Sequence, residues 1–94
     1  MNRTTKEDLI EALTKRFPKA WFKDGADFGS GSDTAVWTGE GSMLNNGLPM
    51  FDYYSTRDCY ANGFGAHEQL CNFVEKHGYY VECYDAGTFL IYPN

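Results

Sequence analysis

Two runs of β-favouring residues, 79–84 and 88–92, are separated by the short segment Asp85-Ala86-Gly87. A three-residue connection with glycine at its last position is typical of a β-hairpin. Side chains alternate across a strand, so this connection sets which residues share a face. We expect the core face to carry the pairs Cys83–Phe89 and Val81–Ile91. The other face, expected to be exposed, would carry the pairs Tyr84–Thr88, Glu82–Leu90 and Tyr80–Tyr92.

The segment before Pro18 predicts an amphipathic helix. Thr5 followed by Asp8 resembles a capping box, in which the hydroxyl accepts a hydrogen bond from the Asp8 amide. Pro18 ends the helix, because the residue before a proline avoids the helical region. The apolar stripe of this helix consists of Leu9, Ile10, Leu13 and Phe17.

A second helix is predicted from Gly65 or Ala66 to His77. Gly78 follows it, where a left-handed residue commonly ends a helix. The residues that share one stripe of this helix are Ala66, Leu70, Phe73, Val74 and His77.

Residues 25–47 are rich in glycine, which predicts turns and loops. Two β-favouring pieces flank part of this region, 20–23 and 34–38, and they could pair as a hairpin across a long connection. We expect Trp37 to be a core anchor of that hairpin. A third strand is predicted over 48–54, with Pro49 near its beginning, where a missing donor does least harm.

The order of elements predicts an α+β fold in one domain, residues 1–94. Two helices would pack on one face of a small, mainly antiparallel sheet that ends in the C-terminal β-hairpin. The 94 residues, 43% of them hydrophobic, are enough for one core. Three cysteines without paired spacing indicate reduced thiols. Neither a signal peptide nor a membrane span is expected, so we predict a cytoplasmic protein.

The charges are divided unevenly along the chain. Residues 1–23 carry six basic and three acidic side chains, a net charge of +3, whereas residues 24–94 carry two basic and ten acidic ones, a net charge of −8. A large negative body favours basic partners and opposes contact with phosphate groups. Direct nucleic-acid binding is therefore not expected, although Lys19, Trp21 and Lys23 could serve it.

We interpret the chain as a small acidic, non-enzymatic protein-binding module that needs no cofactor. It could inhibit a nucleic-acid-binding protein by presenting carboxylates to a basic groove, as small phage or mobile-element proteins can. Ordinary acidic solubility explains the same charge. The predicted contact residues are the acids Asp24, Asp27, Asp33, Glu40, Asp52, Asp58, Glu82 and Asp85, and the tyrosines Tyr53, Tyr54, Tyr60, Tyr80 and Tyr84.

The alternative is a small enzyme or ligand-binding domain that uses the region Asp52–His67. Cys59 and His67 could form a nucleophile pair, but catalysis would also need the thiolate form and a third group that orients the base. Zinc ligation by Cys59, His67, Cys71 and His77 lacks the usual short paired spacing. The glycine-rich segment 25–33 lacks the lysine of a phosphate loop and the ligand pattern of an EF-hand. A homodimer could also form, through the edge of the last strand, 88–92.

Overall fold

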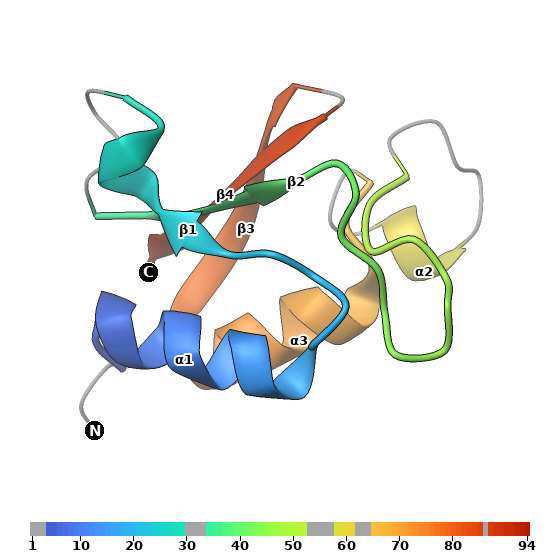
Figure 1. The fold of residues 1–94 in the computed structure, drawn as a ribbon, viewed down its shortest axis with the longest axis horizontal. Coiled ribbons are helices and arrows are strands. Elements are labelled where there is room, and N and C mark those ends of the chain that lie inside the picture. Colours follow the sequence, from blue (N-terminus) through green and yellow to red (C-terminus); the bar gives the residue numbers. More distant parts are fainter. Residues whose placement is uncertain (1–3, 30–33, 53–57, 62–64, 86) are drawn as a thin grey trace.

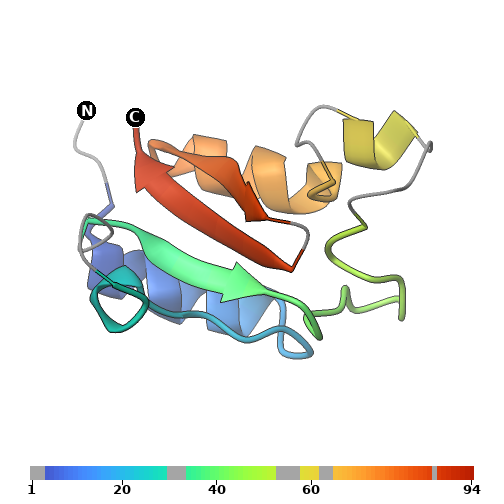
Figure 2. The same cartoon turned by 90° about the horizontal axis from the view of Figure 1, so that it is seen from above.

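The computed structural model describes residues 4–29, 34–52, 58–61, 65–85 and 87–94. In these residues, four strands form an antiparallel sheet in the order β1-β2-β4-β3. The strands are β1 (Lys23–Asp24), β2 (Val36–Gly39), β3 (Tyr79–Asp85) and β4 (Thr88–Pro93). The longer helices, α1 (Lys6–Arg16) and α3 (Glu68–Lys76), lie on the same side of the sheet (Figures 1 and 2). The predicted α+β arrangement is confirmed. Two short helical segments, η1 (Gly25–Asp27) and α2 (Asp58–Ala61), lie in the connections.

Helix α1 begins and ends as its sequence predicts. The Thr5 hydroxyl accepts a hydrogen bond from the Asp8 amide at 3.2 Å. Acidic side chains occupy the first turn and basic ones the last, where each opposes the partial charge of the helix end. Phe17 caps the C-terminus and donates its amide to the Leu13 carbonyl at 2.8 Å. The helix therefore stops directly before Pro18.

Helix α3 begins two residues later than the predicted start at Ala66. His67 is its N-cap, and the His67 Nδ1 atom accepts a hydrogen bond from the Gln69 amide at 3.0 Å. Gly78 has φ 84°, the left-handed conformation expected after the helix. The sequence predicted the helix but not the role of the imidazole, because histidine is not among the common N-cap residues.

A single cluster of buried apolar side chains lies between the helices and the sheet. Burial of such side chains is the main favourable contribution to folding. The connection between β2 and α3 adds Leu44 and Met50 to residues from the regular elements. The other buried members are Leu9, Leu13, Phe17, Val36, Leu70, Val74, Tyr79 and Ile91.

The predicted hairpin register is correct except at the turn. Val81 lies opposite Ile91, Cys83 opposite Phe89, Glu82 opposite Leu90 and Tyr80 opposite Tyr92. The predicted pair Tyr84–Thr88 is wrong, because Asp85 lies opposite Thr88 and the register shifts between Cys83 and Asp85. The Asp85 Oδ1 atom accepts the Gly87 amide at 2.9 Å, which tightens the turn and leaves one extra residue in β3.

Two expectations for the middle of the chain are also wrong. Trp37 is half-buried and lies outside the main core, because its neighbour Val36 faces the helices and side chains alternate along β2. In the described part of segment 48–54, the structure has two isolated bridges, Met43–Pro49 and Phe51–Ala66, instead of a strand. Residues 53 and 54 lie outside the described residues. The first strand, predicted over 20–23, is the two-residue β1.

The last strand is not an edge of the sheet. β4 pairs with β2 on one side and with β3 on the other, so the predicted homodimer contact through 88–92 has no unpaired strand to use. The sequence could not show this, because strand order depends on which distant segment pairs with the hairpin. The two edge strands of the described sheet are β1 and β3.

Gly39 permits a close approach between β2 and the hairpin. A Cβ atom at Gly39 would overlap the Gly87 carbonyl oxygen, a backbone atom that also accepts the Glu40 amide at 2.9 Å. We expect Gly39→Ala to lower the free energy of unfolding by about 1–3 kcal/mol through this overlap. Urea unfolding would measure it. Gly87→Ala is the control, because its new methyl would meet mainly the flexible Glu40 side chain; equal losses would contradict the explanation.

Candidate protein-binding surface

The face of the sheet opposite α1 and α3 carries a group of aromatic side chains. Trp37 of β2 pairs with Leu90 of β4, and Leu90 pairs with Glu82 of β3, so all three point to this side. Neither α1 nor α3 covers it (Figure 2). We call this side the open face; its residues in the described part of the chain include Trp21, Lys23, Phe28, Trp37, Tyr80, Glu82, Tyr84, Leu90 and Tyr92.

Four rings of the open face form a continuous series, which we call the aromatic cluster. Trp21 meets Trp37 edge-on, with ring centroids 5.4 Å apart. Phe28 lies 5.3 Å from Trp37 and 4.9 Å from Tyr84. Edge-on and tilted contacts at these distances are favourable for aromatic rings. The cluster therefore joins residues from both ends of the sheet order.

Three hydrogen bonds hold Trp21 in place. Its indole Nε1 donates to the Glu40 carbonyl at 2.9 Å, and its amide donates to the Ser42 hydroxyl at 3.2 Å. Its carbonyl accepts a bond from the buried Thr38 hydroxyl at 2.7 Å. The indole that begins the cluster is consequently fixed by the turn after β2.

Leu90 is a buried apolar residue on the open face. This side chain points away from the helices, yet only 3% of it is exposed, so the expectation that Leu90 lies on an exposed face is wrong. Burying a leucine of this size contributes roughly 1.5–3 kcal/mol. Trp37 lies opposite Leu90 on the neighbouring strand, so side chains of the open face shield Leu90 from solvent.

Lys23 adds one cation to the aromatic cluster. Its Nζ lies 5.6 Å from the Trp21 ring centroid and 5.4 Å from that of Trp37. Both distances are within the range of cation–π attraction. A basic residue that the sequence assigned to a positive N-terminal segment is thus associated with two indoles, where its charge is partly offset.

The outer strand β3 carries the exposed tyrosines of the open face. Tyr80, Glu82 and Tyr84 are exposed side chains of β3, and we call them the β3 strip. Tyr84 is 62% exposed and Tyr80 is 38% exposed. The Phe28 ring meets Tyr84 edge-on, so this tyrosine is both accessible and supported.

Two carboxylates flank the end of the hairpin. The Asp85 Oδ1 atom accepts the Gly87 amide, and a Cβ atom built on Gly87 would lie 3.3 Å from Glu40 Oε2 and 3.9 Å from Asp85 Oδ1. Both acids are exposed. We call this pair the acidic tip. With Glu82, which lies on β3 like Asp85, it gives one end of the open face a negative charge.

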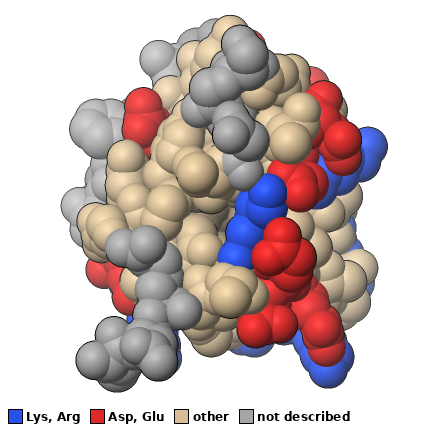
Figure 3. All heavy atoms as spheres, turned by 90° about the vertical axis from the view of Figure 1, so that its left-hand side faces the viewer, with Lys and Arg blue, Asp and Glu red and all other residues tan. Residues whose placement is uncertain are grey.

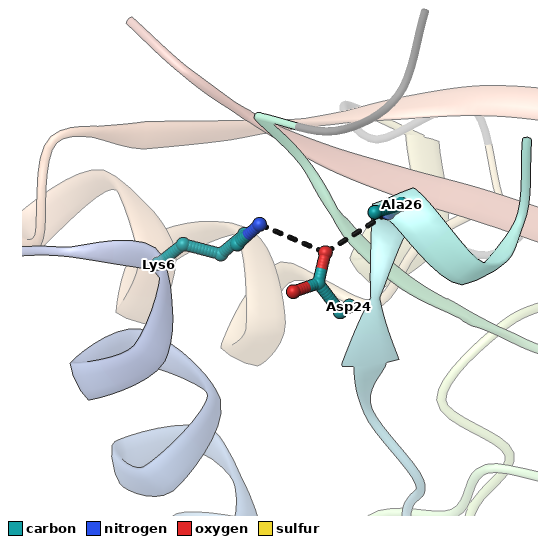
Figure 4. A network of polar contacts seen from close by, with 3 residues as sticks. All are labelled: Lys6, Asp24 and Ala26. Carbon is teal, nitrogen blue, oxygen red and sulfur yellow. Dashed lines mark hydrogen bonds and ion pairs between the residues drawn. The ribbon is translucent and has the colours of Figure 1, made fainter. Parts of the chain in front are cut away.

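Asp24, by contrast, lies on the helix side and has a basic partner. Its Oδ1 atom accepts a hydrogen bond from Lys6 Nζ at 2.8 Å and another from the Ala26 amide at 2.9 Å (Figure 4). Figure 3 shows acidic and basic groups side by side at this end of the molecule. We therefore leave Asp24 out of the candidate surface.

The Asp24 pair has an expected effect on acid stability. The Lys6 hydrogen bond and the Ala26 amide lower the pKa of the Asp24 carboxyl below its ordinary value of 3.8. Because the folded-state pKa is lowered, the stabilisation by the pair is fully present above the ordinary pKa of the carboxyl, and it is lost as the pH falls from there through the folded-state pKa. We expect Asp24→Asn, which can still accept from Ala26, to be less stable than the wild type at pH 7.

At pH 2, urea unfolding should show a smaller difference between these two proteins than at pH 7. Glu7→Gln is the control, because Glu7 is an exposed acid of the same helix as Lys6. A difference between wild type and Asp24→Asn that stays constant from pH 7 to pH 2 would contradict a role for the charged pair.

The other predicted contact residues that the structure describes lie in the connections, outside the four strands. Tyr60 is only 1% exposed and its hydroxyl donates to the Pro49 carbonyl at 2.6 Å, so its prediction as an interface anchor is wrong. Asp52 is half-buried beside Gly65, and Asp27 is exposed in η1. Asp58 begins α2. Asp33, Tyr53 and Tyr54 lie outside the described residues.

The candidate ligands His67, Cys71 and His77 lie in packed or hydrogen-bonded positions within the fold. His67 is 5% exposed and uses Nδ1 to cap α3, while its ring meets Tyr60 edge-on. Burial raises the pKa of the Cys71 thiol to about 11, which disfavours its reactive thiolate. The His77 Nδ1 atom lies 2.7 Å from the Thr4 hydroxyl. Among the described residues, no three His, Cys, Asp or Glu side chains gather as a metal site.

In comparisons with protein families, curated proteins and solved structures, the chain matched none. A search of the described helices found none that combines the length and the apolar character needed to cross a membrane.

Sequence reasoning missed the aromatic cluster as a unit. Trp37 was expected to be a core anchor, and the only binding role considered for Trp21 and Lys23 was contact with nucleic acid. The alternation of Trp37 with Val36 in a short strand was the available signal, since one of the two must face away from the helices. Phe28 gave no such signal, because it lies in a glycine-rich segment without a periodic pattern.

Proposed function

We propose that this chain is a non-enzymatic protein-binding module whose partner docks on the β3 strip and the acidic tip. The observation that carries the proposal is Tyr84, an exposed ring supported from behind by Phe28. Tyrosines that are accessible but already positioned lose little conformational freedom on binding, and they are enriched among residues that dominate interface energies.

The charges nearby favour a basic partner. Glu40, Glu82 and Asp85 are exposed, and Tyr84 lies between the last two of them in β3. Clustered carboxylates raise the association rate of an oppositely charged protein and select against acidic ones. The sharper form of the proposal is a partner whose basic surface binds nucleic acid, so that the module competes with phosphate groups for the same surface.

The test begins with capture from the organism that makes the chain. Immobilised protein is exposed to its extract at low and at high salt, and retained proteins are identified by mass spectrometry. A retained protein counts as the partner only if purified material binds with an association rate that falls as salt rises. Loss of that protein's nucleic-acid binding when the module is added would support the inhibitor form.

Charge reversal then locates the surface. We expect Glu40→Lys with Asp85→Lys to slow association about tenfold, because steering depends on these carboxylates. The matched control is Glu7→Lys with Glu75→Lys, a double reversal of exposed acids on α1 and α3, on the helix side. If all these reversals slow association equally, only the net charge matters and the proposed surface is wrong.

A further inference from the structure

We infer that β3 binds its partner by strand addition, accepting an extended, basic segment of the partner protein as a fifth strand. This inference rests on the proposed function and specifies its mode of contact. An unpaired sheet edge offers backbone donors and acceptors to an incoming strand, while pockets for alternate side chains give specificity. The occupant we commit to is a segment with lysine or arginine at alternate positions.

The topology leaves β3 as the long edge. It pairs with β4 on one side, and no other strand in the described residues pairs with its second side. β3 has seven residues, whereas the opposite edge, β1, has two and leads directly into η1. Paired strands in globular proteins usually have about 3–10 residues, so β3 is long enough to hold a partner and β1 is not.

Within residues 80–83, side chains of the edge strand β3 are more exposed than the side chains of β4 that lie opposite them. Leu90 and Ile91 of β4 are buried, but their β3 partners Glu82 and Val81 are exposed and half-buried. An added strand would cover these half-exposed positions on both faces. Beyond Cys83 the register shift disturbs the regular pattern, so we place the pairing at residues 80–83.

Charge selects the occupant. Residues 79–85 include Glu82 and Asp85 and no basic side chain. A second copy of the chain would bring the same acids together without a base to offset them, and like charges across paired strands are destabilising. A partner with basic residues opposite Glu82 and beside Tyr80 and Tyr84 would form ion pairs and cation–π contacts instead. Small apolar residues would alternate with them, facing Val81 and Cys83.

The probe is the peptide acetyl-Lys-Val-Arg-Val-Lys-Val-Arg-amide, which has this alternation. Two control peptides keep the same charges but carry N-methyl groups, one on all its valines and the other on all its basic residues. In a paired strand, alternate amides point toward the neighbouring strand and the others point away. Binding is measured by nuclear magnetic resonance titration of the full chain, and amide hydrogen exchange reports which backbone groups become protected.

We expect the unmodified peptide to protect amides within residues 80–83. One N-methylated peptide should bind about tenfold more weakly or worse, and the other should bind within about threefold of the unmodified peptide, because one set of amides faces β3. The Glu82→Lys variant should lose affinity for the unmodified peptide, with its fold checked by circular dichroism.

Three outcomes would overturn the inference. The two N-methylated peptides could bind as tightly as the unmodified one, which would show attraction by charge alone. The unmodified peptide could fail to bind, or light scattering on a dilution series could reveal a dimer in which hydrogen exchange finds the β3 amides protected. None of these outcomes contradicts the proposed function while the captured partner still responds to the acidic tip. Failure of the proposed function is seen separately, as the absence of any salt-dependent, tip-dependent partner.

Discussion

Phe17→Ala is expected to lower the free energy of unfolding by about 3–5 kcal/mol, the usual cost of removing a fully buried phenylalanine. Phe17 is completely buried, and its ring meets Phe73 of α3 edge-on at 5.7 Å. It also caps α1, so its contact joins the end of one helix to the other. For a chain of this size the loss is a large fraction of a total stability of roughly 5–14 kcal/mol.

Urea unfolding monitored by tryptophan fluorescence would measure the Phe17→Ala effect. Phe17→Leu is the graded control, because it keeps most of the apolar volume and is expected to cost less than Phe17→Ala. Thr14→Ala is the surface control on the same helix. Similar losses for Phe17→Ala and Thr14→Ala would mean that the two helices do not depend on this ring.

Tyr84→Ala is expected to weaken binding of the captured partner by about 2 kcal/mol, or roughly thirtyfold. Tyr84 is the most exposed of the large apolar side chains among the described residues and lies next to the acidic tip. Because more than half of it is exposed in the unbound protein, its removal should cost less than about 1.5 kcal/mol of stability, mainly the Phe28 contact. The loss should appear mostly as faster dissociation.

Titration calorimetry on the purified partner would measure the affinity of Tyr84→Ala, and surface plasmon resonance would separate its rates. Tyr84→Phe is the matched control, since it keeps the ring and removes only the hydroxyl. If Tyr84→Ala binds as tightly as the wild type, the β3 strip is not the anchor of the interface. If Tyr84→Phe is as weak as Tyr84→Ala, the hydroxyl carries the interaction instead of the ring.

Local patterns account for most of what the sequence predicted correctly. The capping pair Thr5–Asp8 and the break at Pro18 are encoded within a few residues, and α1 follows them. The hairpin register depends on alternation and a short connection, and four of its five predicted pairs are present. The exception lies at the turn, where the Asp85 side chain bonds to the Gly87 amide, a choice that composition alone does not reveal.

The parts that could not be predicted depend on contacts between distant segments. The pairing of β2 with β4 decides that Trp37 faces away from the helices and that the last strand is internal. Tyr60 resembled other tyrosines in sequence, yet its hydroxyl reaches the Pro49 carbonyl from a buried position. Burial of this kind is set by the whole fold and leaves no periodic signal around the residue.

The candidate surface was only partly visible in the sequence. The excess of acids after residue 23 can be counted in the sequence, but the sequence does not show which of these acids face a possible partner. Asp24 is bound to Lys6 on the helix side, whereas Glu40 and Asp85, which are 45 positions apart, flank Gly87. Net charge therefore indicated a class of partner, and tertiary structure indicated where that partner could approach.

Because β4 lies between β2 and β3, the open face stays intact only while β4 is paired with both strands. Trp37 comes from the strand on one side of β4, and Tyr84 comes from the strand on the other. If residues 88–93 detached, the sheet would separate into β1 with β2 on one side and β3 on the other, and the aromatic cluster would be divided. A partner that binds to both pieces would therefore slow this separation. The complex should then resist proteolysis longer than the isolated chain.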